Sequence, residues 1–250
     1  MIELSTKEAK EFIGISIGGK EIGFYVPNGP CLWRAQTLKT KEPWTLEWID
    51  TFTKDDIFWD VGANVGVFTL YAAVIKGVKV FAFEPEAANY RVLNENIRVN
   101  HVTNLVRAYC VGISDKHSLS ELNLSVIETA GSNHQLGQLG LKANPVFIQG
   151  CVTFSLDNLC LHLPKPTRLK IDVDGIEPLI VRGGIEQCLP NVKNMVVEIY
   201  SGSHPRRPNT LKVIKPLLED HGFKWDEEFA EKAVHKSGQY EGVGEHLFTR

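Results

Sequence analysis

The chain has 250 residues, of which 43% are hydrophobic and 23% are charged, a composition typical of globular proteins and unlike that of disordered or fibrous chains. Its 27 lysines and arginines against 30 aspartates and glutamates give a net charge of -3. This balance lacks the basic surplus of a protein that binds nucleic acid, so we expect no nucleic-acid partner.

Five cysteines, an odd number without C-x-x-C spacing, indicate reduced thiols in a cytoplasmic protein. They are Cys31, Cys110, Cys151, Cys160 and Cys188. The first twelve residues carry several charges, which is unlike a signal peptide. No run of about 18 apolar residues occurs, so we expect no membrane span.

The N-terminal part of the chain predicts a hairpin followed by a helix. Apolar residues alternate with small or polar ones over residues 12–26, interrupted by Gly18 and Gly19, which is the pattern of a β-hairpin. Pro43 is well placed as the first residue of a helix that runs toward Phe52. We expect residues 1–54 to form an appendage that acts as a lid.

From residue 55 onward, short apolar runs alternate with segments of helical period. Five runs have the density of strands buried on both faces: residues 57–61, 78–83, 105–111, 168–173 and 192–200. Helical spacing follows over residues 67–75, 86–100 and 177–189, with Pro85 tolerated in a first turn. This alternation predicts a doubly wound α/β domain over residues 55–250, with a mostly parallel sheet and helices on both faces.

Two regions depart from this repeat. Residues 118–150 form an insertion, in which residues 119–126 alternate like an extra strand and a glycine-rich loop follows over residues 131–140; we expect it to lie over the functional site. Near the end, residues 211–220 predict a helix, and residues 246–249 predict a last short strand that closes the sheet edge.

The first βα turn carries the strongest chemical signal. Asp60-Val61-Gly62-Ala63-Asn64-Val65-Gly66 joins a strand to a helix, and such a turn lies at the carboxyl edge of a parallel sheet, where ligands bind. Glu84 follows Asp60 by 24 residues, where an acidic side chain can accept both hydroxyl protons of a ribose. The turn therefore indicates a nucleoside cofactor. Its third glycine is at the wrong spacing for the G-x-G-x-x-G fingerprint of NAD enzymes, so S-adenosylmethionine fits better.

With further segments, this turn resembles the FkbM family of S-adenosylmethionine-dependent class I methyltransferases. The further segments are Phe83-Glu84-Pro85, Leu93-Asn94-Glu95-Asn96, Gly112-Ile113-Ser114-Asp115 and Lys170-Ile171-Asp172-Val173-Asp174-Gly175-Ile176-Glu177. The resemblance implies a seven-stranded Rossmann-like sheet and O-methylation of a hydroxyl on a sugar, glycan or secondary metabolite. The cofactor-binding residues it indicates are Asp60, Gly62, Asn64, Gly66, Glu84, Pro85, Ser114, Asp115 and Asp172. Asp174 departs from the glutamate usual in the family but keeps the charge.

Acids at the ends of the fourth and fifth strands suggest two mechanisms. Asp172, Asp174, Glu177 and Glu198 are expected to face one pocket. Crowded carboxylates raise one another's pKa, which suits a general base, but they could also hold Mg²⁺. Alternatively, Glu177 caps the following helix and Asp174 serves the turn. We favour a metal-free base and predict Asp172, Asp174 and His134 as catalytic residues, with no metal site.

Other possibilities are kept open. His204 is a second candidate base, and the neighbouring Arg206 and Arg207 could receive an acidic group of the substrate. A metal-assisted catechol-like or N-methyltransferase is the alternative function; an NAD-dependent oxidoreductase or a non-catalytic cofactor-binding module is more remote. The acceptor and the oligomeric state are not predicted.

Overall fold

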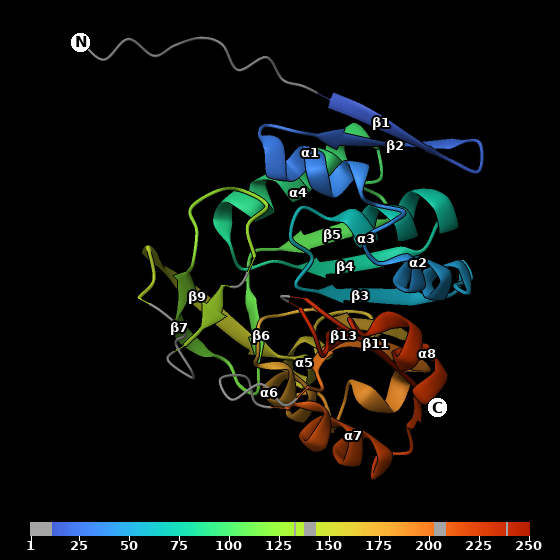
Figure 1. Ribbon diagram of the computed structural model, residues 1–250, viewed down its shortest axis with the longest axis vertical. Coiled ribbons are helices and arrows are strands. Elements are labelled where there is room, and N and C mark those ends of the chain that lie inside the picture. The colour runs from blue at the N-terminus through green and yellow to red at the C-terminus, as the bar shows by residue number, and fades with distance from the viewer. Residues whose placement is uncertain (1–11, 133, 138–143, 203–208, 239) are drawn as a thin grey trace.

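A computed structural model describes residues 12–132, 134–137, 144–202, 209–238 and 240–250. Its main sheet has seven strands in the order β12-β13-β11-β10-β3-β4-β5 (Figure 1). The bounds are β3 Ile57–Val61, β4 Lys79–Phe83, β5 Val106–Tyr109, β10 Arg168–Ile171, β11 Asn194–Tyr200, β12 Lys224–Asp226 and β13 Val243–Thr249. The pairs among β5, β4, β3, β10 and β11 are parallel, while β13 is antiparallel to both β11 and β12. The predicted doubly wound, mostly parallel seven-stranded sheet is confirmed.

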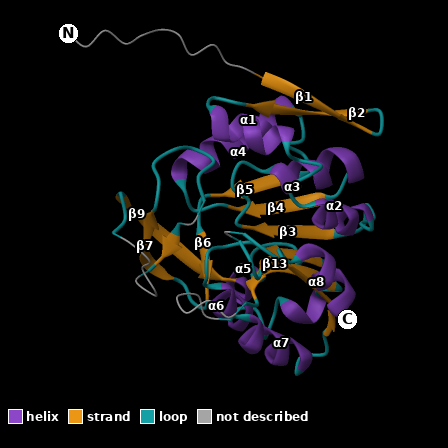
Figure 2. Cartoon of the chain, viewed as in Figure 1, coloured by secondary structure: helices purple, strands orange, loops and turns teal. Residues whose placement is uncertain are grey.

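Helices cover both faces of this sheet (Figure 2), and alternate strand residues feed two apolar cores. In β3, Phe58 packs into one core and Trp59 into the other. The first core includes α2 (Pro43–Asp50), the short α3 (Val67–Leu70), the π-helical turn Tyr71–Lys76 and α4 (Ala87–Val99). The second includes α5 (Leu156–Leu159), α6 (Glu177–Arg182), the 3₁₀ turn Leu189–Asn191 and α7 (Leu211–Glu219). The remaining helix, α8 (Glu227–Ala233), precedes β13.

The N-terminal hairpin forms as expected and packs onto the first core. Strands β1 (Phe12–Ile17) and β2 (Lys20–Tyr25) pair antiparallel across Gly18 and Gly19, both of which have positive φ angles, as a two-residue hairpin turn requires. Ile22 and Phe24 of β2 are buried. The hairpin is followed by α1 (Gly29–Gln36), so this segment shares its core with the main sheet.

Asparagines of α4 fasten the hairpin to the first βα turn. The side-chain oxygen of Asn96 accepts the backbone N–H of Tyr25 at 2.7 Å, and its amide donates to the Val65 carbonyl at 2.8 Å. Asn100 exchanges two hydrogen bonds with the backbone of Gly23. These bonds tie the hairpin to the glycine turn through one helix.

The insertion and the residues that flank it form a second sheet, of which sequence reasoning found only one strand. Its order is β6-β9-β7-β8, with β6 Gly112–Ser114, β7 Ser118–Leu124, β8 Gln135–Leu136 and β9 Phe147–Ser155; Figure 1 shows it projecting from one side of the main sheet. The predicted extra strand corresponds to β7. Residues 133 and 138–143 of the predicted glycine-rich loop lie outside the described residues.

Three local expectations were wrong. The helix after Glu177 ends at Arg182 instead of running to residue 189, because Gly183 and Gly184 follow directly. Strand β13 begins at Val243 and lies between β11 and β12, so it does not close the sheet edge; β12 does. Glu86 is the N-cap of α4, and its carboxylate accepts the N–H groups of Ala88 and Asn89, which leaves Pro85 before the helix.

No helix in the described part of the chain is long and apolar enough to cross a membrane. All five cysteines are free, and four of them are buried.

Candidate active site

The first βα turn brings the ends of three neighbouring strands together. Gly62 and Ala63 donate their backbone N–H groups to the Phe83 carbonyl at the end of β4. Gly62 has a φ of 84°, and a Cβ at this position would lie 1.8 Å from the Asp172 carbonyl oxygen after β10. Only glycine fits there, because any side chain would push β3 and β10 apart.

Glu84 lies at the carboxyl end of β4 and is buried with its carboxylate fixed. One oxygen accepts the Asn64 N–H at 2.7 Å, and the other accepts the Glu86 N–H at 2.9 Å. Burial raises the pKa of Glu84 to about 7, although these two hydrogen bonds act in the opposite direction. The Asn89 side chain is a further hydrogen-bond partner, and a carboxylate has about four acceptor positions, so Glu84 can still accept a hydroxyl of a ribose.

A cavity of about 430 Å³ opens at this edge of the sheet, a size typical of pockets for small ligands. Its wall at β3 and β4 contains Gly62, Asn64, Glu84 and Pro85. Apolar lining comes from Val111, Ile113, Leu122, Leu136, Val173 and Ile176. The opposite wall lies over β11 and β13 and contains Glu198, Tyr200, Thr210, His235, Tyr240 and Glu245.

Residues 129–131 of the insertion, here called the strap, lie beside the cavity on the side of Glu84. The Ala130 N–H donates to the Asn89 oxygen at 2.6 Å, and the Ala130 carbonyl accepts Arg34 Nε at 2.9 Å. The Gly131 carbonyl accepts the Asn64 amide at 2.8 Å. Since Gly131, Ser132 and His134 line the cavity, the insertion lies over the site as expected.

A buried lysine occupies the sheet beneath the cavity. Lys170 of β10 is 1% exposed and forms an ion pair with Asp172, while Glu42 lies 3.9 Å away. Burial favours the neutral amine, but the charges of Asp172, Glu42 and Asp60 outweigh it and raise the pKa of Lys170. Lys170 in turn holds the pKa of Asp172 below its usual range, against the effect of burial.

The other acids of this edge have raised pKa values. Burial raises the pKa of Glu177 to about 8, and its carboxylate accepts the Gly175 N–H at 2.8 Å. Burial and neighbouring carboxylates raise the pKa values of Glu198 and Glu245. Asp174 lines the same cavity. The expected grouping of Asp172, Asp174, Glu177 and Glu198 is therefore present.

Asp60 and Gly66 lie next to the cavity wall without forming it. Asp60 is 1% exposed, accepts the Thr69 hydroxyl at 2.6 Å, and has a pKa raised to about 6 by burial. Gly66 is the N-cap of α3 and packs against Leu93. Both residues therefore support the turn on the side away from the cavity.

Ser114 and Asp115 are not brought into the cavity. The Ser114 carbonyl packs against Gly183, and the Ser114 hydroxyl donates to Asp115 at 3.3 Å. Instead, the residues before them, Val111 to Ile113, form the wall. His134 does line the cavity, and burial lowers its pKa. His204, Arg206 and Arg207 lie outside the described residues.

Sequence reasoning missed several residues of the site. Glu42 and Glu245 line the cavity although each is at least nine-tenths buried; Trp33 and Arg34 of α1 also line it. Glu245 carried one signal, a single charge in the middle of an apolar strand. Among the described residues, no three His, Cys, Asp or Glu side chains are grouped so that they could hold a metal ion.

The fold and the site define an α/β protein of the methyltransferase type, with a cavity at the carboxyl edge of its sheet and a buried acid, Glu84, after its second core strand. Comparison with known proteins agrees: the Methyltransferase FkbM domain matches residues 60–225. The chain belongs to this family, whose members are S-adenosylmethionine-dependent methyltransferases, and is itself such an enzyme.

Three relatives show how far the similarity extends. Hexuronic acid methyltransferase AglP of Haloferax volcanii is 28% identical over 210 residues, which cover 82% of this chain and 81% of that protein. Methyltransferase sdnD of Sordaria araneosa is 30% identical over 205 residues, covering 70% and 76%. The 31-O-demethyl-FK506 methyltransferase FkbM of Streptomyces tacrolimicus is 25% identical over 218 residues, covering 72% and 79%.

A solved structure supports the fold. The methyltransferase FkbM of Methylobacillus flagellatus KT superimposes with a TM-score of 0.54 at 14% identity, covering 80% of this chain and 44% of that one. The present chain thus spans less than half of that neighbour's length.

Proposed function

We propose that the enzyme transfers a methyl group from S-adenosylmethionine to a hydroxyl of a sugar, glycan or secondary metabolite. The observation that carries the proposal is the continuous cavity that joins Glu84 and the glycine turn to a polar wall over β11 and β13. One half has the chemistry for the cofactor, and the other leaves room for an acceptor. Relatives whose names specify a hexuronic acid and an FK506 precursor as substrates support this acceptor class.

The residues at β3 and β4 fit the cofactor. Glu84 can accept the ribose hydroxyls, while Gly62, Asn64 and Pro85 form the adjoining wall. Asp60 and Gly66 keep that wall in shape, and we retain them in the site in this supporting role. Asp172 lies further along the edge, where its carboxylate suits the cationic end of the cofactor. Ser114 and Asp115, which the resemblance also indicates as cofactor-binding residues, do not line the cavity.

When bound, S-adenosylmethionine supplies an electrophilic methyl group on a sulfonium. The chain's own contribution is to align the acceptor oxygen, exclude water and remove the hydroxyl proton. The cavity is lined by Gly131 of the strap (residues 129–131) and, from the N-terminal appendage, by Trp33, Arg34, Lys41 and Glu42. Arg34 also donates to the Ala130 carbonyl of the strap. We propose that residues 1–54 act as a lid on this basis.

The partner and the location are proposed on chemical grounds. The acids lining the cavity and the net charge of -3 favour a small or glycan acceptor over nucleic acid. The free cysteines favour the cytoplasm. A gel-shift titration at low salt tests the first proposal, because tight and salt-sensitive binding of DNA or RNA would contradict it. Fractionation of the source cell tests the second.

A methyl-transfer assay tests the acceptor class. The full chain is incubated with S-adenosylmethionine labelled at the methyl group and with either 4-nitrophenyl β-D-glucuronide or 4-nitrophenyl β-D-glucoside. We expect label in an ether product that resists mild base, whereas a methyl ester would be hydrolysed. Label on nitrogen in a parallel reaction with glucosamine, and on neither glycoside, would favour the N-methyltransferase alternative instead.

A further inference from the structure

The wall of the cavity opposite Glu84 carries a pair of glutamates on neighbouring strands. Glu198 of β11 stands directly across from Glu245 of β13 in the antiparallel register. Side chains at directly opposed positions share one face, with Cβ atoms about 5 Å apart. Both residues line the cavity, so both carboxyl groups lie at the wall where an acceptor would bind.

A third glutamate, Glu42, lies next to Glu198 and Glu245. Glu42 precedes α2 and is 6% exposed. One of its oxygens pairs with Lys41, and the other lies 3.9 Å from Lys170 Nζ and has no hydrogen-bond partner in the described part of the chain. Glu245 is 5% exposed. Glu198 alone of the three keeps part of its surface open, and this surface faces the cavity. Glu198 is therefore the member that an acceptor can touch.

A neighbouring hydroxyl also points to a polar ligand at this wall. Thr210 lines the cavity and is 6% exposed, yet its Oγ1 has no hydrogen-bond partner among the described residues. A buried hydroxyl left unpaired costs free energy, about 1–3 kcal/mol. An acceptor with several hydroxyl groups would supply the missing partner.

The charges around Glu198 distinguish it from Asp172. Lys170 neutralises Asp172 directly through their ion pair, so that carboxylate has little affinity for a proton. Burial acts most strongly on Glu198, followed by four carboxyl groups on three surrounding segments: Asp172 and Asp174 after β10, Glu42 before α2 and Glu245 on β13. Burial and the neighbouring carboxyl groups both favour the protonated form of Glu198.

We infer that Glu198 is the catalytic base that takes the proton from the acceptor hydroxyl, and that Glu245, directly across from it on β13, is the residue that positions it. This inference rests on the proposed O-methylation. As the acceptor oxygen forms its new bond to the methyl carbon, the bond from that carbon to sulfur breaks. The hydroxyl proton passes to the Glu198 carboxylate, which becomes a neutral carboxyl group as the sulfonium becomes a neutral thioether, so the net charge is unchanged.

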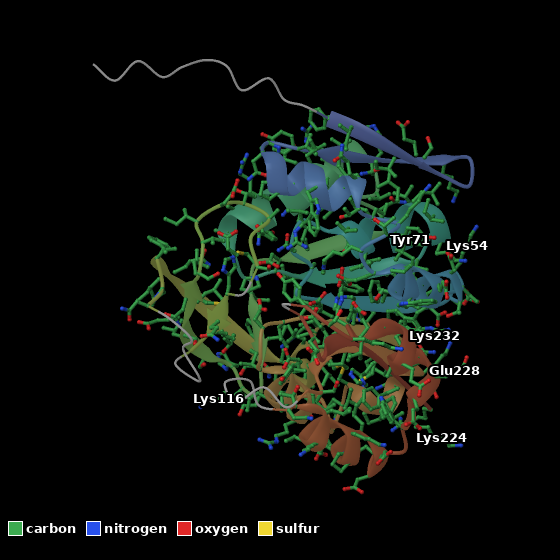
Figure 3. The ribbon with its side chains drawn as sticks, in the orientation of Figure 1. Lys54, Tyr71, Lys116, Lys224, Glu228 and Lys232 are labelled. Carbon is green, nitrogen blue, oxygen red and sulfur yellow. The ribbon has the colours of Figure 1, made fainter. Side chains whose placement is uncertain are left out.

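The kinetic test compares Glu198→Gln with Glu228→Gln. Glu228 lies on α8, far from the cavity, in an exposed pair with Lys232 (Figure 3). For the glycoside that accepts methyl groups, Glu198→Gln should lower kcat by about 10²- to 10⁴-fold. Its Kd for S-adenosylhomocysteine should stay within about twofold of wild type. Glu228→Gln should match wild type in both.

The pH profile separates catalysis from structure. For wild type, kcat/KM should rise with pH to a plateau as Glu198 loses its proton. Glu245→Gln removes one repelling carboxyl, so the acid limb should move to lower pH; a merely structural role would not move it. Replacing one of several crowded acids should also leave the melting temperature unchanged or raised. If the Glu198→Gln variant does not fold, Glu198→Asp is measured in its place. This variant retains a carboxylate, so it should keep part of the wild-type kcat.

A titration that needs no acceptor keeps the inference testable if both glycosides fail. In the complex with S-adenosylhomocysteine, ¹³C NMR of labelled glutamate carboxyls should show one resonance, absent in Glu198→Gln, that titrates above the ordinary range of a glutamate. Titration of that resonance within the ordinary range would overturn the inference. So would wild-type kcat in Glu198→Gln, or activity that is abolished by chelator and restored by Mg²⁺. Failure of the glycosides with the expected titration would count against the acceptor class alone.

Discussion

Replacing Glu84 by glutamine should weaken cofactor binding by a predictable amount. The glutamate carboxylate accepts two backbone N–H groups, at 2.7 and 2.9 Å, and it faces the cavity, where it can also accept a ribose hydroxyl. A glutamine has one acceptor oxygen, and its amide would face an N–H donor. We expect the loss of one hydrogen bond to a charged acceptor, about 1.5–3 kcal/mol, and hence about 10- to 150-fold in Kd.

The ionisation of Glu84 also predicts how the Kd of the wild-type enzyme for S-adenosylhomocysteine changes with pH. With a pKa of about 7, Glu84 is roughly one-tenth ionised at pH 6 and nine-tenths at pH 8. If the ribose requires the carboxylate, S-adenosylhomocysteine should bind about tenfold more tightly at pH 8. The stability effect has the opposite sign. The folded-state pKa of Glu84 exceeds the ordinary value of 4.5. The contribution of Glu84 to the free energy of unfolding is therefore full below pH 4.5 and is lost as pH rises through 7.

Calorimetric titration with S-adenosylhomocysteine at pH 6 and 8 measures both effects, and Glu228→Gln is again the control. The tenfold pH dependence should disappear in Glu84→Gln. An unchanged Kd in a folded Glu84→Gln variant would refute the reasoning and place the ribose elsewhere.

Three further predictions follow from the turn, the ion pair and the acids. Gly62→Ala should abolish S-adenosylhomocysteine binding or soluble expression. Gly19 has a similar φ and nothing near the position of a Cβ, so Gly19→Ala should lower the free energy of unfolding by only about 1 kcal/mol in a urea melt. Equal effects of the two variants would contradict the close contact between Gly62 and the Asp172 carbonyl. Asp172→Asn should lower the free energy of unfolding by about 3 kcal/mol, because Lys170 loses its buried partner; an unchanged urea midpoint would show that the pair contributes little. Dialysis against chelator should leave methyl transfer unchanged, and recovery that requires Mg²⁺ would favour the metal-assisted alternative.

The core of the fold and the cofactor half of the site could be predicted from sequence for a physical reason. Strands buried on both faces, such as Ile57–Val61, are dense apolar runs, and the chain reversals beside them need glycine. Glu84 follows such a strand directly, so its place at the sheet edge is determined by local sequence alone.

The missed parts depend on distant contacts. Strand β9 lies in a small sheet that leaves Ile148 and Val152 exposed, so it lacks the buried, dense pattern of the core strands. The order of β12 and β13 is set by tertiary pairing, which sequence spacing does not determine. Likewise, Glu42 and Glu245 meet Glu198 only because the start of α2 and β13 pack at the same sheet edge.

Calorimetric titration of the wild-type chain with S-adenosylhomocysteine and with NAD⁺ tests the central claim most directly. The cavity at the ends of β3, β4 and β10 predicts saturable, one-to-one binding of S-adenosylhomocysteine with a Kd on the order of micromolar, which corresponds to a binding free energy of about −8 kcal/mol. Titration with NAD⁺ should give no saturable heat. Saturable NAD⁺ binding with no response to S-adenosylhomocysteine would contradict the assignment of this site.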